Sequence, residues 1–420
     1  MDLDLDLGRD ELIFVGAALG MLHWLDEQLP PGAVVLIEEP DVIHRRNVAA
    51  LAADLPVVSR VVPAEYQTGL DVDALLAREP GLAAARLVVP GIEYAVPAAA
   101  RLADRLGLPG AGPGAAEVFA DKHRMRQVAA GAGLPNPAYE LVGTPERAAA
   151  FAERFGGRCV LKPTRRSGSL GVQLITEPAA IASAWATTAA PEEPPEATDR
   201  GLPTEVLVEQ LVVGPEHSVE LLVADGEVCF ANVTDKRVLP GPRPVETGHT
   251  VPSALPAAAR AELVEVATRL AAAAGFRTGV LHSEWIVADG VPTLVECAAR
   301  LPGDMIAALV SVAYDCGFIP AYLRLLRGER PALPARPAGA AAVEFLLAPP
   351  GTVTAVTGVR AALRAPGVLS AQVDVAVGEI LGEVVSSARR SGLVLTWGDD
   401  PAEATRAARH AAGLVEISVG

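Results

Sequence analysis

The sequence has few cysteines and no long apolar segment, and each shortage excludes a class of protein. The apolar run 12–22 is too short to span a bilayer, and aspartates precede it instead of the basic start of an export signal. We therefore expect a cytoplasmic protein with no membrane partner. The cysteines lack the spacing of metal ligands, so we expect reduced and mostly buried thiols at Cys159, Cys229, Cys297 and Cys316.

Basic residues are also in short supply. The chain has 35 of them against 51 acidic residues, and its net charge is −16. Such a chain cannot readily build a basic face, so we expect no nucleic-acid partner. Half of the residues are hydrophobic, which favours a chain folded throughout. A length of 420 residues exceeds one ordinary core, so we expect two or three domains.

Lysine is the rarest charged residue. Only three of the 35 basic residues are lysines, namely Lys122, Lys162 and Lys236. Arginine serves solubility equally well, so the exceptions indicate places where a compact, flexible point charge is needed. Chance survival of three lysines is the alternative, and their positions in the fold decide between the two.

The first hundred residues alternate apolar strands with amphipathic helices. This alternation predicts an α/β unit with an open, largely parallel sheet covered by helices. The best-defined helix is 96–106, and the expected strands are 12–15, 33–37, 57–61 and 87–89. No Gly-x-Gly-x-x-Gly follows the first strand, so dinucleotide binding there is unsupported.

The rest of the chain contains more strands. We expect a β-hairpin formed by 280–287 and 293–297, and a final small α/β module with a helix at 401–412. Residues 187–203 are rich in Ala, Pro, Glu and Thr, and they predict an exposed insertion with little to bury, open to disorder.

A lysine and a glycine-bearing loop form the first chemical motif. Lys162 ends an expected strand, and Gly168 and Gly171 lie in the loop after it. Small residues let backbone N–H groups approach phosphate oxygens, while the lysine neutralises their charge. The loop is not a Walker A motif, because Gly-Lys-Ser/Thr is absent. An ordinary strand–turn–strand connection explains this loop alone equally well.

Three motifs in succession carry a family resemblance. They are Asp121-Lys122-His-Arg-Met125, the loop segment 162–172 and Val208-Glu209-Gln210, with Glu216 and Glu220 following the last. Their succession resembles the ATP-grasp superfamily, and later motifs resemble its L-amino-acid ligase branch. The resemblance implies a Rossmann-like domain (1–115), an ATP-grasp domain (116–330) of two α+β subdomains gripping ATP, with a lid at 121–205, and a C-terminal module (335–420) that completes the ligase.

The resemblance also assigns nucleotide-binding positions. It places Lys122 and Lys162 on ATP phosphates, and Lys236 at a third ATP-associated position. Glu216 would accept the ribose hydroxyls, since both carboxylate oxygens can accept. The lid loop would contain Ser167, Gly168, Ser169 and Gly171, and the adenine hinge Glu209, Gln210 and Val212. Taken singly, Glu209 or Glu216 is more often a solvated carboxylate at a strand end.

Two glutamates on the late hairpin are candidate ligands of Mg²⁺, for which Mn²⁺ could substitute. Glu284 and Glu296 offer hard oxygen donors. A two-residue Asp289-Gly290 turn would pair 283 with 296 and send the two glutamates to opposite faces. A three-residue loop would pair Glu284 with Glu296 on one face. The metal interpretation therefore requires the three-residue loop, and a two-residue turn would defeat it.

The chain departs from the superfamily pattern after the second glutamate. The usual Glu-x-Asn-x-Arg becomes Glu296-Cys-Ala-Ala-Arg300, so Ala298 cannot coordinate a second metal ion. One Mg²⁺ is expected, and the second is in doubt. The resemblance places Arg300 opposite the acyl-phosphate, where a guanidinium can meet oxyanion charge. A structural ion pair is an equally good explanation of Arg300 from spacing alone.

The segment Glu246-x-x-His249 resembles the amino-acid ligase branch and places both residues near substrate. The implied reaction joins a carboxylic acid to an amine through an acyl-phosphate and releases ADP and phosphate. We expect both substrates to be small molecules, in the first place amino acids. A carboxylase acting through carboxyphosphate and a non-catalytic ATP-binding protein remain alternatives. We expect a homodimer.

Overall fold

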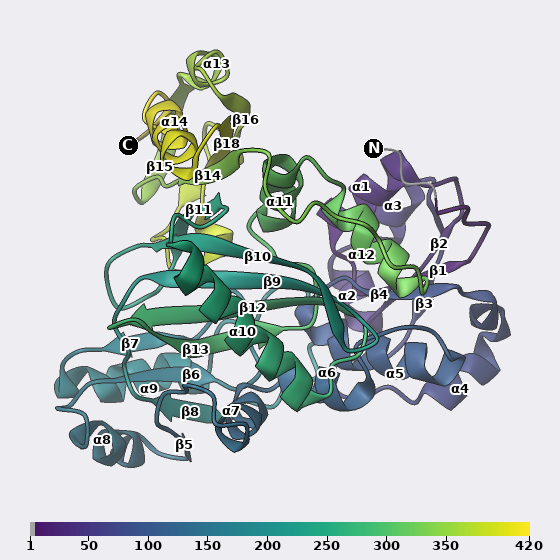
Figure 1. The fold of residues 1–420 in the computed structure, drawn as a ribbon, viewed down its shortest axis with the longest axis horizontal. Coiled ribbons are helices and arrows are strands. Elements are labelled where there is room, and N and C mark those ends of the chain that lie inside the picture. Colours follow the sequence, from purple (N-terminus) through teal and green to yellow (C-terminus); the bar gives the residue numbers. More distant parts are fainter. Residues whose placement is uncertain (1–4) are drawn as a thin grey trace.

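The computed structural model describes residues 5–420, and its first unit is a four-stranded parallel sheet in the order β3-β2-β1-β4 (Figure 1). Its strands are β1 (Leu12–Val15), β2 (Val34–Glu38), β3 (Val58–Pro63) and β4 (Leu87–Pro90). Leu12 and Phe14 pack toward α1 (Leu19–Gln28) and α12 (Phe318–Leu326), whereas Ile13 packs toward α5 (Val96–Leu106). Helices thus cover both faces, which confirms the predicted architecture. Shorter helices α2 (Pro40–Arg45), α3 (Val48–Ala53) and α4 (Val72–Arg78) complete the unit.

A small antiparallel sheet forms the second unit, in the order β5-β8-β6-β7. Its strands are β5 (Tyr139–Val142), β6 (Cys159–Pro163), β7 (Gln173–Ile175) and β8 (Val206–Glu209), and its helices are α8 (Pro145–Glu153) and α9 (Ile181–Ala189). Helices α6 (Pro113–Phe119) and α7 (Lys122–Gly131) precede it. The side chain of Asp121 caps α7 by accepting from the backbone N–H groups of His123 and Arg124, which holds Lys122 in the first turn.

The central sheet has eight strands in the order β13-β12-β9-β10-β11-β14-β18-β16 (Figure 1). Its first strands are β9 (Glu216–Ala224), β10 (Glu227–Val238), β11 (Glu246–Val251), β12 (Gly279–Ala288) and β13 (Val291–Ala298). Helix α10 (Ala257–Ala274) packs on one face of these strands. The last strands are β14 (Ala340–Leu346), β16 (Val368–Val373) and β18 (Gly392–Gly398). The C-terminal strands therefore continue the central sheet.

The remaining C-terminal elements lie around this sheet. The helices α13 (Val359–Ala362) and α14 (Pro401–Ala412) pack beside β14, β16 and β18. A three-stranded sheet of β17 (Ile380–Leu381), β15 (Gly351–Thr357) and β19 (Glu416–Val419) completes the module. The mixed α/β fold class, with a parallel N-terminal sheet and a C-terminal module, is as predicted.

Residues 187–203 are exposed at more than half of their positions, as their composition predicts, but the segment is also tied to the N-terminal unit. Helix α9 extends to Ala189, and the buried residues of this segment are Thr188, Ala197, Thr198 and Leu202. The backbone N–H of Thr198 donates to Oε1 of Gln67 at 2.9 Å, and Arg200 donates to buried Glu39 at 2.6 Å. Composition did not indicate these polar contacts to the N-terminal unit, because it counts apolar groups and not hydrogen-bond partners.

The structure bears on two features noted in the sequence, the few cysteines and the short apolar runs. Within residues 5–420 all four cysteines are free. In the same residues no single helix is long and apolar enough to cross a bilayer. Only α11 (Ile306–Tyr314) and α12 together reach that length, bent by 107°, and both contribute to the core shared with the N-terminal sheet.

Candidate active site

A cavity of about 240 Å³, the main cavity, lies between the small antiparallel sheet and the central sheet. The three lysines come from α7, β6 and β10, and all of them line it. Of the predicted site residues only Ser167 and Gly171 lie off its wall; those on it are Lys122, Lys162, Gly168, Ser169, Glu209, Gln210, Val212, Glu216, Lys236, Glu246, His249, Glu284, Glu296 and Arg300. Residues far apart in the sequence therefore meet in one place.

Lys162 and Glu209 belong to a buried cluster of three charges. The ammonium of Lys162 lies 2.7 Å from Oε2 of Glu209, and Arg126 binds both carboxylate oxygens at 2.7 and 3.0 Å. Burial would raise the pKa of Glu209, but the charges of Arg126 and Lys162 lower it to about 2. Burial lowers the pKa of Lys162, and Arg126 adds to the effect, although Glu209 opposes it. Glu209 is thus a buried carboxylate, not a solvated one.

Arg126 is a site residue that the sequence did not reveal. Its side chain is fully buried, and it also donates to the carbonyls of Leu294 and Val295 at 2.9 and 2.7 Å. It thereby ties α7 to β13 beside the predicted metal ligands. A buried arginine on a short helix has no local signal, because its partners come from distant strands.

Lys236 lies among three carboxylates. It binds Glu284, and its ammonium is 3.5 Å from Glu246. Burial would lower the pKa of Lys236, but Glu284, Glu246 and Glu216 raise it, so the lysine stays charged. Glu216, opposite Lys236 in the strand pairing, has its pKa raised to about 7 by burial, although Lys236 lowers it. Near neutral pH the Glu216 carboxyl can therefore both donate and accept hydrogen bonds.

The β12–β13 hairpin corrects the predicted route to a metal site. Ala288 pairs with Val291, so the connection is the two-residue turn Asp289-Gly290, with positive φ at both residues. That turn was expected to separate the glutamates. A β-bulge between Glu284 and Trp285 shifts the register by one residue, and Glu284 pairs with Glu296. The stated requirement was wrong, because a bulge restores the pairing that the turn removes.

Glu284 and Glu296 fit a Mg²⁺ ion held partly by nucleotide. Both line the main cavity and both supply hard oxygen donors. Residues 5–420 contain no cluster of three or more His, Cys, Asp or Glu side chains that could hold a metal. Protein would thus supply two carboxylates, and phosphate and water the remaining ligands, which is the usual pattern for Mg²⁺.

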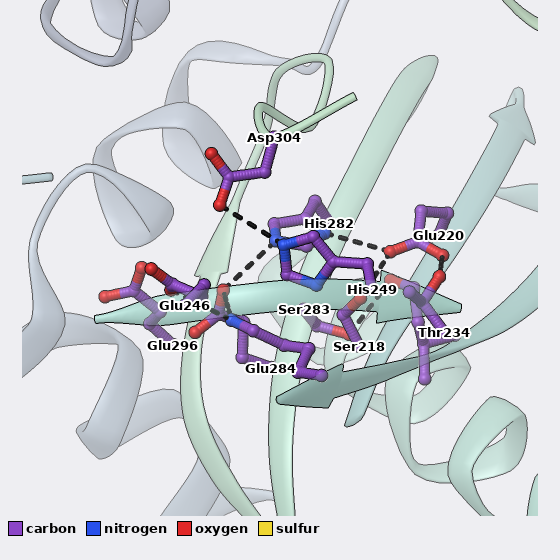
Figure 2. A network of polar contacts seen from close by, with 12 residues as sticks. Ser218, Glu220, Thr234, Glu246, His249, His282, Ser283, Glu284, Glu296 and Asp304 are labelled. Carbon is purple, nitrogen blue, oxygen red and sulfur yellow. Dashed lines mark hydrogen bonds and ion pairs between the residues drawn. The ribbon is translucent and has the colours of Figure 1, made fainter. Parts of the chain in front are cut away.

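A buried hydrogen-bond network supports Glu284 from behind (Figure 2). Nδ1 of His282 is 3.0 Å from Glu220, and its Nε2 is 3.2 Å from Glu284. Glu220 is fully buried and also accepts from Ser218 and Thr234, each at 2.7 Å. Burial would lower the pKa of His282, but Glu220 and Glu284 raise it to about 9, so both ring nitrogens donate at neutral pH. The imidazolium therefore holds one Glu284 oxygen in place.

The C-terminal module supports the site through residues that the sequence did not indicate, Ser387 and Arg390. Nε2 of His249 is 3.2 Å from Asp304, and Arg390 binds both oxygens of Asp304 at 2.9 and 2.5 Å. Ser387 donates to Glu246 at 2.8 Å. Burial lowers the pKa of His249, although Asp304 opposes it, and Nδ1 of His249 is buried without a partner among the described residues. A neutral imidazole thus lies beside Glu246.

Arg300 lies where the main cavity meets the N-terminal unit. Its Nε donates to Glu93 at 2.7 Å, and its side chain keeps 21% of its surface exposed. A second cavity of about 60 Å³, the side cavity, has Glu93 and Ser167 on its wall. It adjoins the main cavity, because Lys122, Arg166 and Glu296 line both. Arg300 is thus ion-paired with Glu93 while part of its side chain stays accessible.

Two family models match separate parts of the chain. Residues 156–308 match the ATP-grasp domain, and residues 344–420 match the L-amino acid ligase C-terminal domain 2. The first includes Lys162, Glu209, Glu284 and Arg300, and the second includes Arg390. Both matched regions therefore contribute side chains to the wall or the support of the main cavity.

Several known proteins are similar to this chain over part of their length. The alanine–anticapsin ligase of Bacillus subtilis (strain 168) is 31% identical over 227 residues, 49% of this chain and 46% of that protein. Carnosine synthase 1 of Gallus gallus is 31% identical over 252 residues, 57% of this chain and 27% of that protein. The match thus spans less than half the length of either relative. An L-amino acid ligase structure from Bacillus licheniformis is similar in fold, with a TM-score of 0.76, 20% identity, and coverage of 98% of this chain and 100% of that one.

Proposed function

We propose that the chain is an ATP-dependent carboxylate–amine ligase, because residues 156–308 match the ATP-grasp domain and residues 344–420 match the L-amino acid ligase C-terminal domain 2. The reaction would form an amide or dipeptide bond and release ADP and phosphate. Relatives named as alanine–anticapsin ligase and carnosine synthase favour an amino acid as one substrate. The observation that carries the proposal is the meeting of all three lysines with the pair Glu284 and Glu296 in one cavity.

The nucleotide would lie between the two antiparallel sheets. Lys162 and Lys122 would meet its phosphates, since both residues line the cavity together with Gly168 and Ser169 of the loop. The positive φ of Gly168 and Ser169 suits a loop whose backbone N–H groups turn toward an anion. Phosphoryl transfer needs mainly alignment and charge neutralisation, which these groups provide.

Glu284 and Glu296 would hold the metal ion, which when bound would offset phosphate charge and orient the oxygens. His282 keeps Glu284 oriented, as described above. Lys236 offsets the carboxylate charge of Glu284, Glu246 and Glu216. Two register positions from the Glu284–Glu296 pair, His282 lies opposite Ala298, so the usual asparagine has no replacement there.

The acid would be activated near Arg300. Its carboxylate attacks the γ-phosphate, and an acyl-phosphate and ADP form. The amine nitrogen then attacks the acyl carbon, the carbon–oxygen bond to phosphate breaks, and the amine proton ends on the released phosphate. Arg300 can stabilise the oxyanion with its guanidinium. Glu246 would bind a substrate ammonium group and neutral His249 would accept a proton, because both residues line the main cavity.

The test is phosphate release from ATP over a panel of carboxylic acids crossed with amines. A ligase requires an acid and an amine together for full turnover, and Glu284→Gln should abolish it. The matched control is Glu140→Gln, which changes a partly exposed carboxylate of the small sheet that lines neither cavity. Turnover that depends on bicarbonate alone would indicate a carboxylase. ATP binding by calorimetry without turnover on any pair would indicate a non-catalytic binder.

A further inference from the structure

A short segment of the C-terminal module, between β17 and β18, holds two residues that line the main cavity. The hydroxyl of Ser387 donates to Glu246 at 2.8 Å, and Arg390 binds both carboxylate oxygens of Asp304. Asp304 in turn lies 3.2 Å from Nε2 of His249 (Figure 2). Both Glu246 and His249 lie on strand β11, so one module presents these side chains and another fixes them.

The guanidinium of Arg390 is fixed at each of its nitrogens. Nε donates to the carbonyl of Ser387 at 2.8 Å, and the terminal nitrogens donate to Asp304 at 2.9 and 2.5 Å. The guanidinium carbon also lies 3.7 Å from the centre of the Phe345 ring, an arrangement that favours a cation. The same ring packs edge-on against His249, with 5.8 Å between the ring centres. Arg390 is therefore held in one place, beside the histidine.

The backbone at Asp304 needs such a partner. Asp304 and Met305 both have positive φ, 55° and 65°. Residues other than glycine rarely adopt this conformation, and it persists where surrounding contacts hold it. Arg390 supplies those contacts from outside the loop, which begins at the proposed oxyanion partner Arg300.

The charges around His249 show a second effect of Arg390. Burial lowers the pKa of His249 and Lys236 on β10 adds to this, whereas Asp304 and Glu246 raise it. Strand β14 and helix α11 present apolar side chains at this place. Burial would raise the pKa of Asp304, but His249 and Arg390 hold it well below its usual range, so the ionised carboxylate accepts from Nε2 of His249. Without Arg390, the negative charge of Asp304 would act on the imidazole alone and favour its protonation.

We propose that Arg390 is a positioning residue of the ligase reaction and acts on His249 through Asp304. By binding both oxygens of Asp304, it fixes the ring of His249 and keeps that ring neutral, ready to accept a substrate proton. The C-terminal module would thus set the state of a residue on the central sheet. The effect on turnover rests on the proposed ligase function, whereas the effect on the ring of His249 is measurable without turnover.

The first measurement follows the histidine rings by NMR as the pH is changed. The His249 resonance is identified by its loss in His249→Gln. Arg390→Met should raise the midpoint of the His249 titration by at least about one pH unit, because an opposite charge in contact shifts a pKa by about 1–3 units. Arg390→Lys keeps the positive charge and should give a smaller rise. The matched control is Arg389→Met, since Arg389 is an exposed neighbour off the wall of the main cavity, and it should give none.

A double variant separates the charge effect from a general disturbance. When Asp304→Asn is added to Arg390→Met, the carboxylate that would favour the imidazolium is gone as well. The midpoint of His249 should then return to within about half a pH unit of wild type. A rise that persists in the double variant would mean that Arg390 does not act through Asp304, and would overturn the inference.

The second measurement is kcat/KM against pH, on an acid and amine pair that wild type uses. Arg390→Met should be about tenfold below wild type at neutral pH and should recover as the pH rises, because the acidic limb of the profile follows His249. The Kd for ATP should stay within about twofold of wild type. Arg390→Lys should recover part of the turnover without moving the acidic limb as far.

The outcomes separate this inference from the proposed function. An unchanged His249 midpoint in Arg390→Met overturns the inference, whatever the turnover. A raised midpoint with a wild-type pH profile of kcat/KM overturns the positioning role and leaves the ligase function standing. If wild type releases phosphate with no acid and amine pair, the ligase function fails and the positioning role falls with it.

Discussion

Replacing Lys162 with Met tests where the nucleotide binds. The change removes one ammonium group from the main cavity and keeps most of the side-chain volume. Glu209 would retain its two hydrogen bonds from Arg126, so the buried carboxylate stays paired and the fold should persist. The variant therefore separates the loss of a phosphate contact from the loss of structure.

The expected change in ATP affinity follows from the contacts among Lys162, Glu209 and Arg126. A charge-assisted hydrogen bond is worth about 1.5–3 kcal/mol, which corresponds to a rise in Kd of about 10- to 150-fold. Lys162 shares its ammonium with Glu209 at 2.7 Å, so part of its charge is already used. We therefore expect the lower half of the range, a Kd for ATP about 10- to 40-fold higher than that of wild type.

The assay is calorimetric titration of ATP with Mg²⁺ into wild type, Lys162→Met and the control Arg147→Met. Arg147 lies on α8 with 69% of its side chain exposed and lines neither cavity. A Kd for Lys162→Met within twofold of wild type, with an unchanged unfolding midpoint, would refute the placement of phosphate beside Lys162.

Four further predictions follow from the same contacts. Glu296→Gln removes a charged ligand at constant size, so turnover should fall far more than ATP affinity, as phosphate-release kinetics and calorimetry would reveal. Arg300→Lys keeps the charge but loses the planar fork, so kcat should fall with little change in binding; a loss of thermal stability alone would indicate a structural arginine. The fall in the pKa of Glu209 from 4.5 to about 2 corresponds to about 3 kcal/mol of stability, present above about pH 4.5 and lost as the pH falls toward 2. The difference in unfolding free energy between wild type and Glu209→Gln should shrink over that window in urea titrations. The 164–171 loop should become resistant to proteolysis when ATP and Mg²⁺ are added, and equal cleavage in both states would contradict a lid.

Local patterns in the sequence predicted the elements well where one short segment decides its own conformation. β1 and the helices α5 and α14 have the bounds read from apolar periodicity. The spacing of apolar residues in a strand or helix is a property of a short stretch of sequence, so it can be recognised without knowing the tertiary structure. The scarcity of lysine was likewise a property of the sequence alone, and all three lysines lie in the main cavity.

Tertiary structure decided what depends on pairing between distant segments. The bulge after Glu284 cannot be read from the turn, because β12 is also paired to β9, with Glu284 opposite Ser218. The buried residues of the 187–203 segment include Thr198, which the N-terminal unit binds through Gln67 and Asp41. Arg126 and the C-terminal Arg390 joined the site through partners far away in the sequence. Composition and spacing thus determined which chemistry the chain carries, whereas strand register and domain contacts determined which side chains face one another, since those are set by long-range packing.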